Sequence, residues 1–530
     1  MEASKQRVVY FIIFFAISIS ITNQFVTLFE TTEARYAEIG REMLVSGDFI
    51  EPRLNGIKHF HKPPLTYWAI AAGLKVFGIN NFGARFFGAL ASLITLIFTF
   101  KTTKFFVSDE EREFPVYILA SSFLFIAVSK IVATDIYLTM FTIITQYFYF
   151  NQIYGKRSVY NSICIGIFMG LGFLTKGPII FIFTILPYFV LKIFLQEFRK
   201  VFDIKSILLA TLSFTIISLP WYIMVIHKNP ELLNYFFKVQ TVDRVATDRF
   251  HRSKPFYFFF VVIFTTFLPY IFYVVRGIID LKKLDKKVWV LLTFIAVPFI
   301  VFNLSTSKLA TYILPFYPLM SVLGYLLFNR YFDIKSFRIF LYFMILLTIF
   351  SPSVILFYED LKENFLLMFI ISIVALSFLL YLMKIKDIRK IILTLSIFFI
   401  SVMSLSYFVI ASIEKDINGY YNMSSTMNRI DPDKKIKTLV YNNTIPSLSF
   451  YRNSLVVMSY GKERETQFED NNMYKEYYLT NDDEIKKFIE INKEFFLVTK
   501  GSYLKEFSQK FGKNCQRLFS QKKSNLYLCK

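Results

Sequence analysis

Long apolar runs separated by short polar segments fill the first four fifths of the chain, up to about residue 412. About thirteen of these runs approach the roughly 20 apolar residues that a helix needs to cross a bilayer. The pattern therefore predicts a polytopic α-helical membrane protein. The predicted spans lie near residues 8–29, 82–100, 114–132, 134–151, 160–175, 178–196, 206–226, 256–275, 288–304, 309–328, 339–357, 364–383 and 390–412.

The composition changes near residue 413, where polar sequence replaces the apolar runs. Residues 481–491 are predicted to form a helix with Asn481 as N-cap and acidic residues in the first turn. Short strands are predicted at 437–441, 454–459 and 494–499. We therefore expect two domains, a membrane domain at 1–412 and a small external α/β domain at 413–530. This tail shows no nucleophile elbow, phosphate loop or metal-ligand spacing, which favours a lid or docking module.

Basic residues alternate between loops, and their distribution predicts the orientation. Placing the basic loops and the N-terminus in the cytoplasm puts two long loops, 30–81 and 227–255, and the tail outside. The net charge of +21 then follows mainly from topology, so no nucleic-acid partner is expected. Outer cations could hold anionic lipid head groups. The basic loops lie at 101–112, 156–157, 199–205, 276–287, 330–338 and 384–390.

The first external loop is dense in ionisable residues. Thr31 or Thr32 can cap a helix through TEARYAEIGREML, which places Glu33 in the first turn, where the helix dipole favours an anion. A solvated amphipathic helix with internal Glu–Arg pairs is the alternative, and it is favoured for Arg41 and Glu42. A functional role is favoured for Glu33, Arg35 and Tyr36.

Further unusual charges are expected at the same outer face. Lys62 precedes two prolines that hold it at the membrane rim, although a lysine there could simply extend to water or lipid phosphate. Ionisable groups within a membrane usually face a cavity, and these cations would suit phosphate or diphosphate groups. A purely structural Asp–Lys pair remains the alternative. Besides Lys62, the residues expected at this outer face are Asp135, Lys176, Lys308 and Tyr312.

The second long external loop, at 227–255, carries several cations beside an aromatic patch. Arginine suits bidentate phosphate recognition, whereas no His/Asp/Glu group has metal-ligand spacing, so neither a metal nor another cofactor is predicted. Cys164 is interpreted as an apolar filler. Cys515 and Cys529 flank a predicted hairpin, where an oxidising compartment would permit a disulfide. The loop cations are His227, Arg244, Arg249, His251 and Arg252.

Seven segments spread over residues 32–318 together resemble the GT-C glycosyltransferases of the lipid A 4-amino-4-deoxy-L-arabinose transferase type, which are related to protein O-mannosyltransferases. The resemblance implies thirteen spans and a multi-pass position in the bacterial inner membrane. It also implies a periplasmic catalytic face and tail, a polyprenyl-phosphate sugar donor and a lipid A phosphate acceptor. The segments are TEARYAEIGREMLVSGDFI, NGIKHFHKPPLTYW, NNFGARFFGAL, GFLTKGP, LPWYIMVIHKNPELLNYFFKVQTVDR, HRSKPFYFFF and KLATYILPFYP.

The resemblance also implies roles by motif position. The expected catalytic residues are Glu33, Lys62 and Asp135. The binding residues expected by motif position are Arg35, Tyr36, Lys176, Arg244 and Tyr312. Glu30, His61 and Lys308 are further binding candidates from their places at the same outer face. Two positions depart from the aminoarabinose pattern, because Thr32 and His61 stand where that subgroup has acids. Glu30, one helical turn before Glu33, could restore a second carboxylate.

The motifs predict an enzyme that transfers a sugar, with an amino sugar as the expected group. A phosphate acceptor is already ionised and needs no general base, whereas a hydroxyl acceptor would need one, with Glu33 or Glu30 as candidate. A related transferase acting on a protein or another glycan is one alternative. A lipid or glycolipid transporter is the other, but it should carry charges near mid-membrane and often internal repeats.

Overall fold

The computed structural model describes residues 2–530 except 31, 243–252, 281–284, 357–358, 414–418, 461–467, 469–475 and 522–523. Its internal contacts divide the chain into two units. The membrane unit holds residues 1–22 and 88–409, and the loop–tail unit holds residues 23–87 and 410–530. The predicted boundary after residue 412 stays a prediction, since the contacts group the first external loop with the tail.

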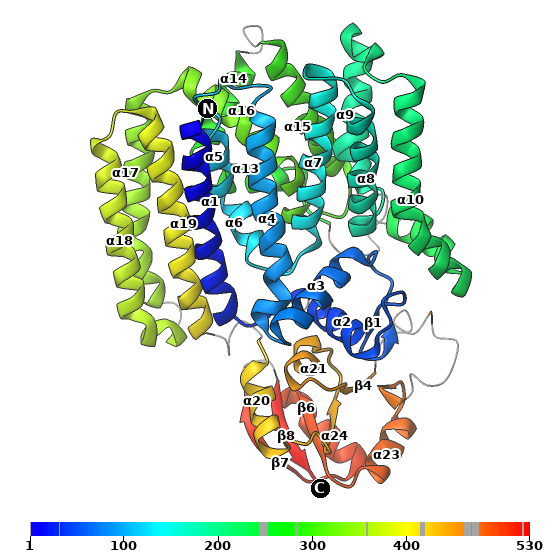
Figure 1. The fold of residues 1–530 in the computed structure, drawn as a ribbon. Helices are drawn as coiled ribbons and strands as arrows, with labels where there is room; N and C mark the ends of the chain where they lie inside the picture. The colour runs from blue at the N-terminus through cyan, green and yellow to red at the C-terminus, as the bar shows by residue number, and fades with distance from the viewer. Residues whose placement is uncertain are drawn as a thin grey trace. The chain divides into compact units, whose positions relative to one another are not determined.

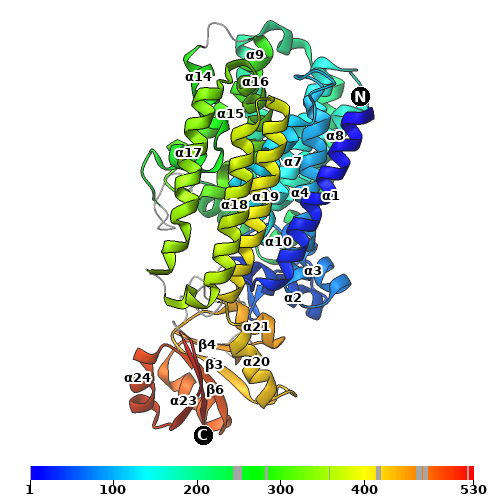
Figure 2. The ribbon, with the colours of Figure 1, turned by 90° about the vertical axis from the view of Figure 1, so that its left-hand side faces the viewer.

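Helices make up the membrane unit (Figure 1). Its last three long helices, α17, α18 and α19, lie side by side in Figures 1 and 2. The helices are α1 (Glu2–Phe25), α4 (Asn81–Thr103), α5 (Phe114–Ser121), α6 (Phe123–Ser129), α7 (Thr134–Tyr154), α8 (Val159–Lys176), α9 (Ile179–Phe194), α10 (Ile204–Lys228), α13 (Phe258–Thr266), α14 (Tyr270–Ile279), α15 (Lys286–Leu304), η4 (Ala310–Phe316), α16 (Tyr317–Tyr331), α17 (Ile334–Phe350), α18 (Phe365–Lys384) and α19 (Ile388–Ser412). The end of α1 after residue 22, the start of α4 before residue 88 and the end of α19 after residue 409 belong to the other unit.

Within the described residues, nine helices are long and apolar enough to cross a membrane, and a bent pair, α6 and α7, adds a tenth candidate. The chain is therefore a polytopic helical membrane protein with a C-terminal α/β domain. Two predicted spans are interrupted. The span near 114–132 divides into α5 and α6 at the extended Ser122. The span near 256–275 divides into α13 and α14 before Pro269, which has no N–H to donate to a continuous helix.

Close helix packing explains a pair of glycines in the membrane unit. Gly166 and Gly170 stand four residues apart on α8 and face α10. A Cβ at Gly166 would lie 2.1 Å from the carbonyl oxygen of Ala210, and one at Gly170 would lie 3.0 Å from Cβ of Ile217. Small residues at this spacing let two membrane helices approach closely.

The loop–tail unit begins with α2 (Thr32–Ser46), the short hairpin β1 (Arg53–Leu54) and β2 (Ile57–Lys58), and α3 (Leu65–Phe77). Its tail forms a six-stranded sheet of order β5-β4-β3-β6-β8-β7. Strands β3 to β6 pair in parallel, and β8 and β7 continue antiparallel. The tail elements are α20 (Tyr421–Ile430), β3 (Lys437–Val440), α21 (Pro446–Arg452), β4 (Val457–Ser459), β5 (Tyr478–Leu479), α23 (Asp482–Ile491), β6 (Phe495–Thr499), α24 (Gly501–Phe511), β7 (Cys515–Ser520) and β8 (Asn525–Cys529).

Alternating side chains of the strands give the sheet two apolar faces. Val440 packs with Met427 and Leu448 beneath α20 and α21, whereas Leu439 packs with Phe488 and Phe507 beneath α23 and α24. The α/β fold predicted for the tail is thus confirmed. Its details agree as well, because the Asn481 side chain accepts a hydrogen bond from the Glu484 N–H (2.9 Å), and Cys515 and Cys529 form a disulfide across β7 and β8.

Candidate functional site

Three predicted site residues from three separate elements meet in the membrane unit. Nζ of Lys176, the last residue of α8, lies 2.6 Å from Oδ1 of Asp135 in the first turn of α7. The same Nζ lies 4.4 Å from the ring centre of Tyr312 in η4. All three side chains are buried. We call this group the membrane cluster.

The sequence GFLTKGP explains the position of Lys176. Gly177 adopts a φ of +72°, which an L side chain rarely adopts, and Pro178 precedes the first turn of α9. The chain therefore turns directly after Lys176 and leaves its side chain at the helix end. A buried lysine beside one carboxylate and one aromatic face is held in position by ionic and cation–π attraction.

Lys308 lies in the same unit, in the segment before η4. It is buried, and its Nζ donates a hydrogen bond to the carbonyl oxygen of Lys254 (3.2 Å). His227, at the end of α10, is exposed. Arg244, Arg249, His251 and Arg252 lie outside the described residues, so their predicted roles stay predictions.

Glu33 forms a bidentate ion pair that the sequence analysis missed. Its Oε1 lies 2.8 Å from Nε of Arg85, and its Oε2 lies 2.9 Å from Nη2. Oε2 also accepts the Phe29 N–H at 2.9 Å. Both side chains are buried. An arginine inside the apolar run of NNFGARFFGAL could have indicated this partner, because such a charge is costly in a membrane segment unless it is paired.

Arg85 holds the chain that leads into α2. Its guanidinium donates hydrogen bonds to the carbonyl oxygens of Asn23 (2.8 Å), Val26 (2.5 Å) and Thr27 (3.0 Å) in addition to Glu33. Because both oxygens of Glu33 accept hydrogen bonds, Glu33 anchors this segment.

Glu30 contacts the tail, and the pKa of its carboxyl is raised. Its Oε1 accepts the Ser447 N–H from α21 at 2.8 Å. Burial raises the pKa of Glu30 to about 7, although the hydrogen bonds from Ser447 and the nearby Arg35 guanidinium act in the opposite direction. Within the described part of the chain, Oε2 of Glu30 and Nε of Arg35 are buried without a hydrogen-bond partner.

Two ring pairs lie among the remaining first-loop residues. The rings of His59 and His61 lie 3.9 Å apart, and burial together with the charges of His61 and Arg35 lowers the pKa of His59 well below its usual value. Tyr36 packs edge-on against Tyr67 at 5.7 Å. Lys62 is buried.

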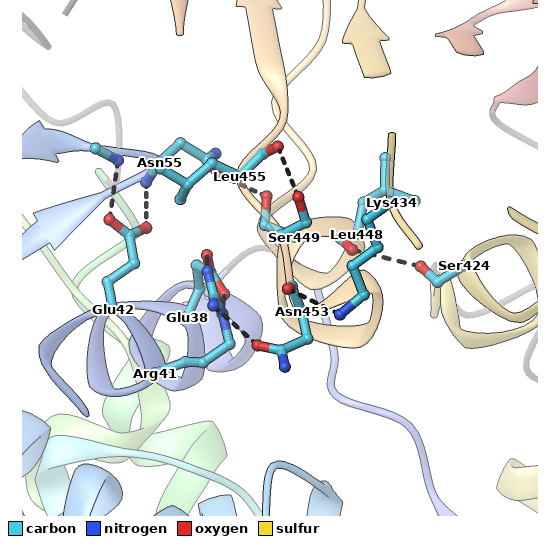
Figure 3. Close-up of polar contacts among 12 residues, drawn as sticks. Glu38, Arg41, Glu42, Asn55, Ser424, Lys434, Leu448, Ser449, Asn453 and Leu455 are labelled. Carbon is cyan, nitrogen blue, oxygen red and sulfur yellow. Dashed lines mark hydrogen bonds and ion pairs between the residues drawn. The ribbon is translucent and has the colours of Figure 1, made fainter. Parts of the chain in front are cut away.

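Residues 38–43 of α2 are buried, so the charges predicted there to be solvated are not. Figure 3 shows their polar contacts. Arg41 pairs with Glu38 at 2.7 Å and donates to Oδ1 of Asn453 at 3.1 Å. Glu42 accepts the N–H groups of Asn55 (2.5 Å) and Gly56 (2.9 Å). The predicted internal Glu–Arg pairing is present, but α21 and the β1–β2 hairpin pack on α2 and exclude water.

Burial raises the pKa of both glutamates of this group, Glu38 and Glu42. It raises the pKa of Glu38, and it raises that of Glu42 to about 8 with help from the charge of Glu38, whereas the Gly56 N–H and Arg41 lower it. No group of three or more His, Cys, Asp or Glu side chains suited to a metal occurs among the described residues.

Comparison with known proteins places these residues in context. Residues 6–236 match the family model of dolichyl-phosphate-mannose-protein mannosyltransferase. The chain is 32% identical over 302 residues to an undecaprenyl phosphate-alpha-4-amino-4-deoxy-L-arabinose arabinosyl transferase of Proteus mirabilis, with coverage of 56% of this chain and 54% of that protein. An enzyme of the same description from Edwardsiella ictaluri is 30% identical over 315 residues, with coverage of 56% and 54%. The chain spans about half the length of these curated relatives.

The fold matches over nearly the whole chain. The crystal structure of ArnT from Cupriavidus metallidurans bound to undecaprenyl phosphate gives a TM-score of 0.84 at 18% identity, with coverage of 99% of this chain and 98% of that one. The apo crystal structure of the same protein gives a TM-score of 0.83 at 19% identity.

Fold and sequence together define a multi-pass membrane protein. The resemblance in the sequence motifs, to GT-C glycosyltransferases of the lipid A aminoarabinose transferase type, agrees with the family model over residues 6–236 and with the curated relatives, which match about half of this chain.

Proposed function

We propose that this protein transfers a sugar from a polyprenyl-phosphate donor to a phosphate of lipid A at the periplasmic face of the bacterial inner membrane. The membrane cluster carries the proposal, because it presents a buried, fixed cation at a helix end in a chain with this fold. The curated relatives are named for an undecaprenyl-phosphate-linked aminoarabinose, which makes an amino sugar the expected group.

Lys176 is proposed to neutralise the phosphate that leaves the sugar. Negative charge grows on this phosphate as the glycosidic bond breaks, and a fixed cation in a site of low dielectric stabilises that charge without rearranging. Oδ1 of Asp135 lies 2.6 Å from Nζ of Lys176 and holds this lysine ammonium group in place. In the first loop, Lys62 is the second candidate for phosphate, and Arg35 could bind a phosphate oxygen through its unpaired Nε.

The state of Glu33 favours a phosphate acceptor. Both of its oxygens are occupied by Arg85 and the Phe29 N–H, so we assign it an anchoring role. An ionised phosphate attacks without a general base, and the acidic residue missing at Thr32 is then not required. Glu30, with a pKa of about 7, is the remaining candidate base for a hydroxyl acceptor.

The topology is part of the proposal. We propose thirteen spans, a cytoplasmic N-terminus and a periplasmic tail. The basic loops support this orientation through the positive-inside rule. The disulfide in the tail supports it too, because such bonds persist in oxidising compartments such as the periplasm.

The test is a transfer assay with purified protein, labelled polyprenyl-phosphate sugar and lipid A. Wild type is expected to label lipid A, and Lys176→Ala to reduce the rate by about a hundredfold, the scale of losing one oriented charge at a developing anion. Lys286→Ala, which removes an exposed ion pair with Glu197, is the control and should retain the wild-type rate.

Other outcomes would contradict the proposal in distinct ways. Labelling of a protein or a different glycan instead of lipid A would reject the acceptor. Movement of the labelled lipid across vesicles without any transfer would reject the enzyme in favour of a transporter. Mass spectrometry of lipid A from cells with and without the protein identifies the sugar.

A further inference from the structure

Helix α21 of the tail makes several polar contacts with the first external loop, within the loop–tail unit. Ser447 donates its N–H to Glu30 (2.8 Å), Ser449 donates its hydroxyl to Oδ1 of Asn55 (2.5 Å), and Asn453, directly after the helix, accepts from Arg41 (3.1 Å). Figure 3 shows the last two residues facing α2 and the β1–β2 hairpin. The helix is thus docked along the part of the chain that carries the predicted first-loop site.

Tyr451 contacts the segment that precedes Glu33. Its hydroxyl accepts the Leu28 N–H at 2.7 Å and donates to Oδ1 of Asn81 at 2.6 Å. The amide of Asn81 in turn donates to the carbonyl oxygen of Gln24 at 3.0 Å. One hydroxyl therefore joins the start of α4 to the segment between α1 and α2.

The same segment is held by the Glu33–Arg85 pair. The Phe29 N–H, one residue after the one bound by Tyr451, donates to Glu33, and Arg85 binds the carbonyl oxygens of residues 23, 26 and 27. Loss of the Tyr451 hydroxyl would leave the Leu28 N–H and the Asn81 oxygen without this partner, and such a loss is costly where water has little access.

We propose that Tyr451 is a positioning residue for sugar transfer, by which the C-terminal domain fixes the segment that orients Glu33 and the start of α2. It acts through the Leu28 N–H and Asn81 and does not touch the substrate. This inference rests on the proposed function and extends it, because it makes the tail part of the catalytic apparatus and not only a lid.

Tyr451→Phe tests the proposal because it removes one oxygen and keeps the ring, which packs edge-on with Tyr421 at 5.3 Å. We expect kcat for transfer to fall about tenfold with little change in KM for the donor, since a misplaced reacting geometry lowers the rate of the bound complex. Amide hydrogen exchange at residues 28–33 should accelerate, because the Leu28 N–H loses its acceptor.

Two further variants provide the controls. Tyr503→Phe removes a hydroxyl from α24, against the other face of the sheet, and should retain both kcat and the exchange rate at Leu28. In the Asn81→Ala background, Tyr451→Phe should cause a smaller further loss than it does alone, since residues in one hydrogen-bond network are not additive.

The readouts separate this inference from the function on which it rests. If wild type transfers no sugar, the proposed function fails, and exchange at Leu28 still tests the contact made by Tyr451. If wild type is active, an unchanged kcat in Tyr451→Phe overturns the positioning role. A lower kcat with unchanged exchange at Leu28 overturns it as well, because the effect would then travel by another route.

Discussion

The ion pair of Glu33 and Arg85 illustrates how single residues bear on the stability of the loop–tail unit. Arg85 is only 1% exposed and has four oxygen-bearing groups around it. Arg85→Ala would leave the Glu33 carboxylate buried beside a cavity. We expect a loss of about 3–5 kcal/mol in the free energy of unfolding, the usual cost of breaking a buried pair from one side.

Thermal unfolding in detergent measures this loss. Lys286→Ala breaks an ion pair of similar length at the surface, and we expect it to change stability by no more than about 1 kcal/mol. Equal losses of stability in the two variants would show that the buried pair contributes no more to the free energy of unfolding than the surface pair.

At the membrane cluster, Asp135→Asn should separate orientation from charge. The asparagine can still accept a hydrogen bond from Lys176, but it no longer supplies the opposite charge at 2.6 Å. We expect transfer to fall by about tenfold or more, as measured by the rate of lipid A labelling. A variant that retained the full rate would exclude Asp135 from the proposed machinery.

Residue types explain which site residues could be predicted. Asp135 and Lys176 stand out because ionisable residues in membrane spans are rare, and Tyr312 was indicated by its motif. The structure brings all three together. The role of Glu33 could not be read in the same way. Its partner lies 52 positions further along the chain, and spacing on one helix does not indicate such a distant pair.

At the scale of elements, the contact of α8 with α10 depends on glycine. Gly166→Leu would place its side chain against the Ala210 carbonyl, where even a Cβ has only 2.1 Å. The two helices must then separate, so we expect a lower unfolding temperature and a smaller yield of folded protein in detergent. Cys164→Ala, on the same helix, is the control and should fold like wild type.

The raised pKa of Glu42 in α2 leads us to expect that the free energy of unfolding depends on pH. The pKa of Glu42 is about 8 in the folded protein, against an ordinary value of 4.5. Folding therefore favours the protonated form, so this contribution is fully present below about pH 4.5 and is lost as the pH rises through about 8. Wild type should unfold at a higher temperature at about pH 6 than at about pH 9.

Glu42→Gln should flatten this profile, since glutamine does not titrate. Some dependence should remain, because the pKa values of Glu38 and Glu30 are also raised. Melting curves of both proteins across this pH range provide the measurement, and equally steep profiles would contradict the assignment to Glu42.

The α2 charges also show a limit of pattern reading. The period correctly predicted the helix and the place of Glu33 in its first turn, whereas the candidate cap Thr31 lies outside the described residues. The same pattern favoured a solvated face at Arg41 and Glu42, and that prediction was wrong. Asn453, directly after α21, contacts Arg41 from more than 400 positions away, and the turn between β1 and β2 binds Glu42. Local periodicity indicates that one face of a helix is polar, but it does not indicate whether another part of the chain packs on that face.

At the scale of the whole molecule, the orientation in the membrane can be tested with single cysteines. A membrane-impermeant thiol reagent should label Lys505→Cys, on α24 of the tail, in intact spheroplasts. Lys335→Cys, in a predicted cytoplasmic loop, should react only after the membrane is opened. The reverse pattern would invert the proposed topology. Apolar runs and basic loops sufficed to predict the membrane class, but not the helix breaks at Ser122 and before Pro269.

The grouping of the first external loop with the tail has a consequence for biosynthesis. Residues 23–87 emerge from the ribosome long before residues 410–530, with which they share one unit. At ordinary rates of translation the delay lasts tens of seconds, during which the charges of α2 must wait in water or with a chaperone. A nascent chain released early would lack α21, so the site segment would be completed only in molecules whose synthesis had reached the tail.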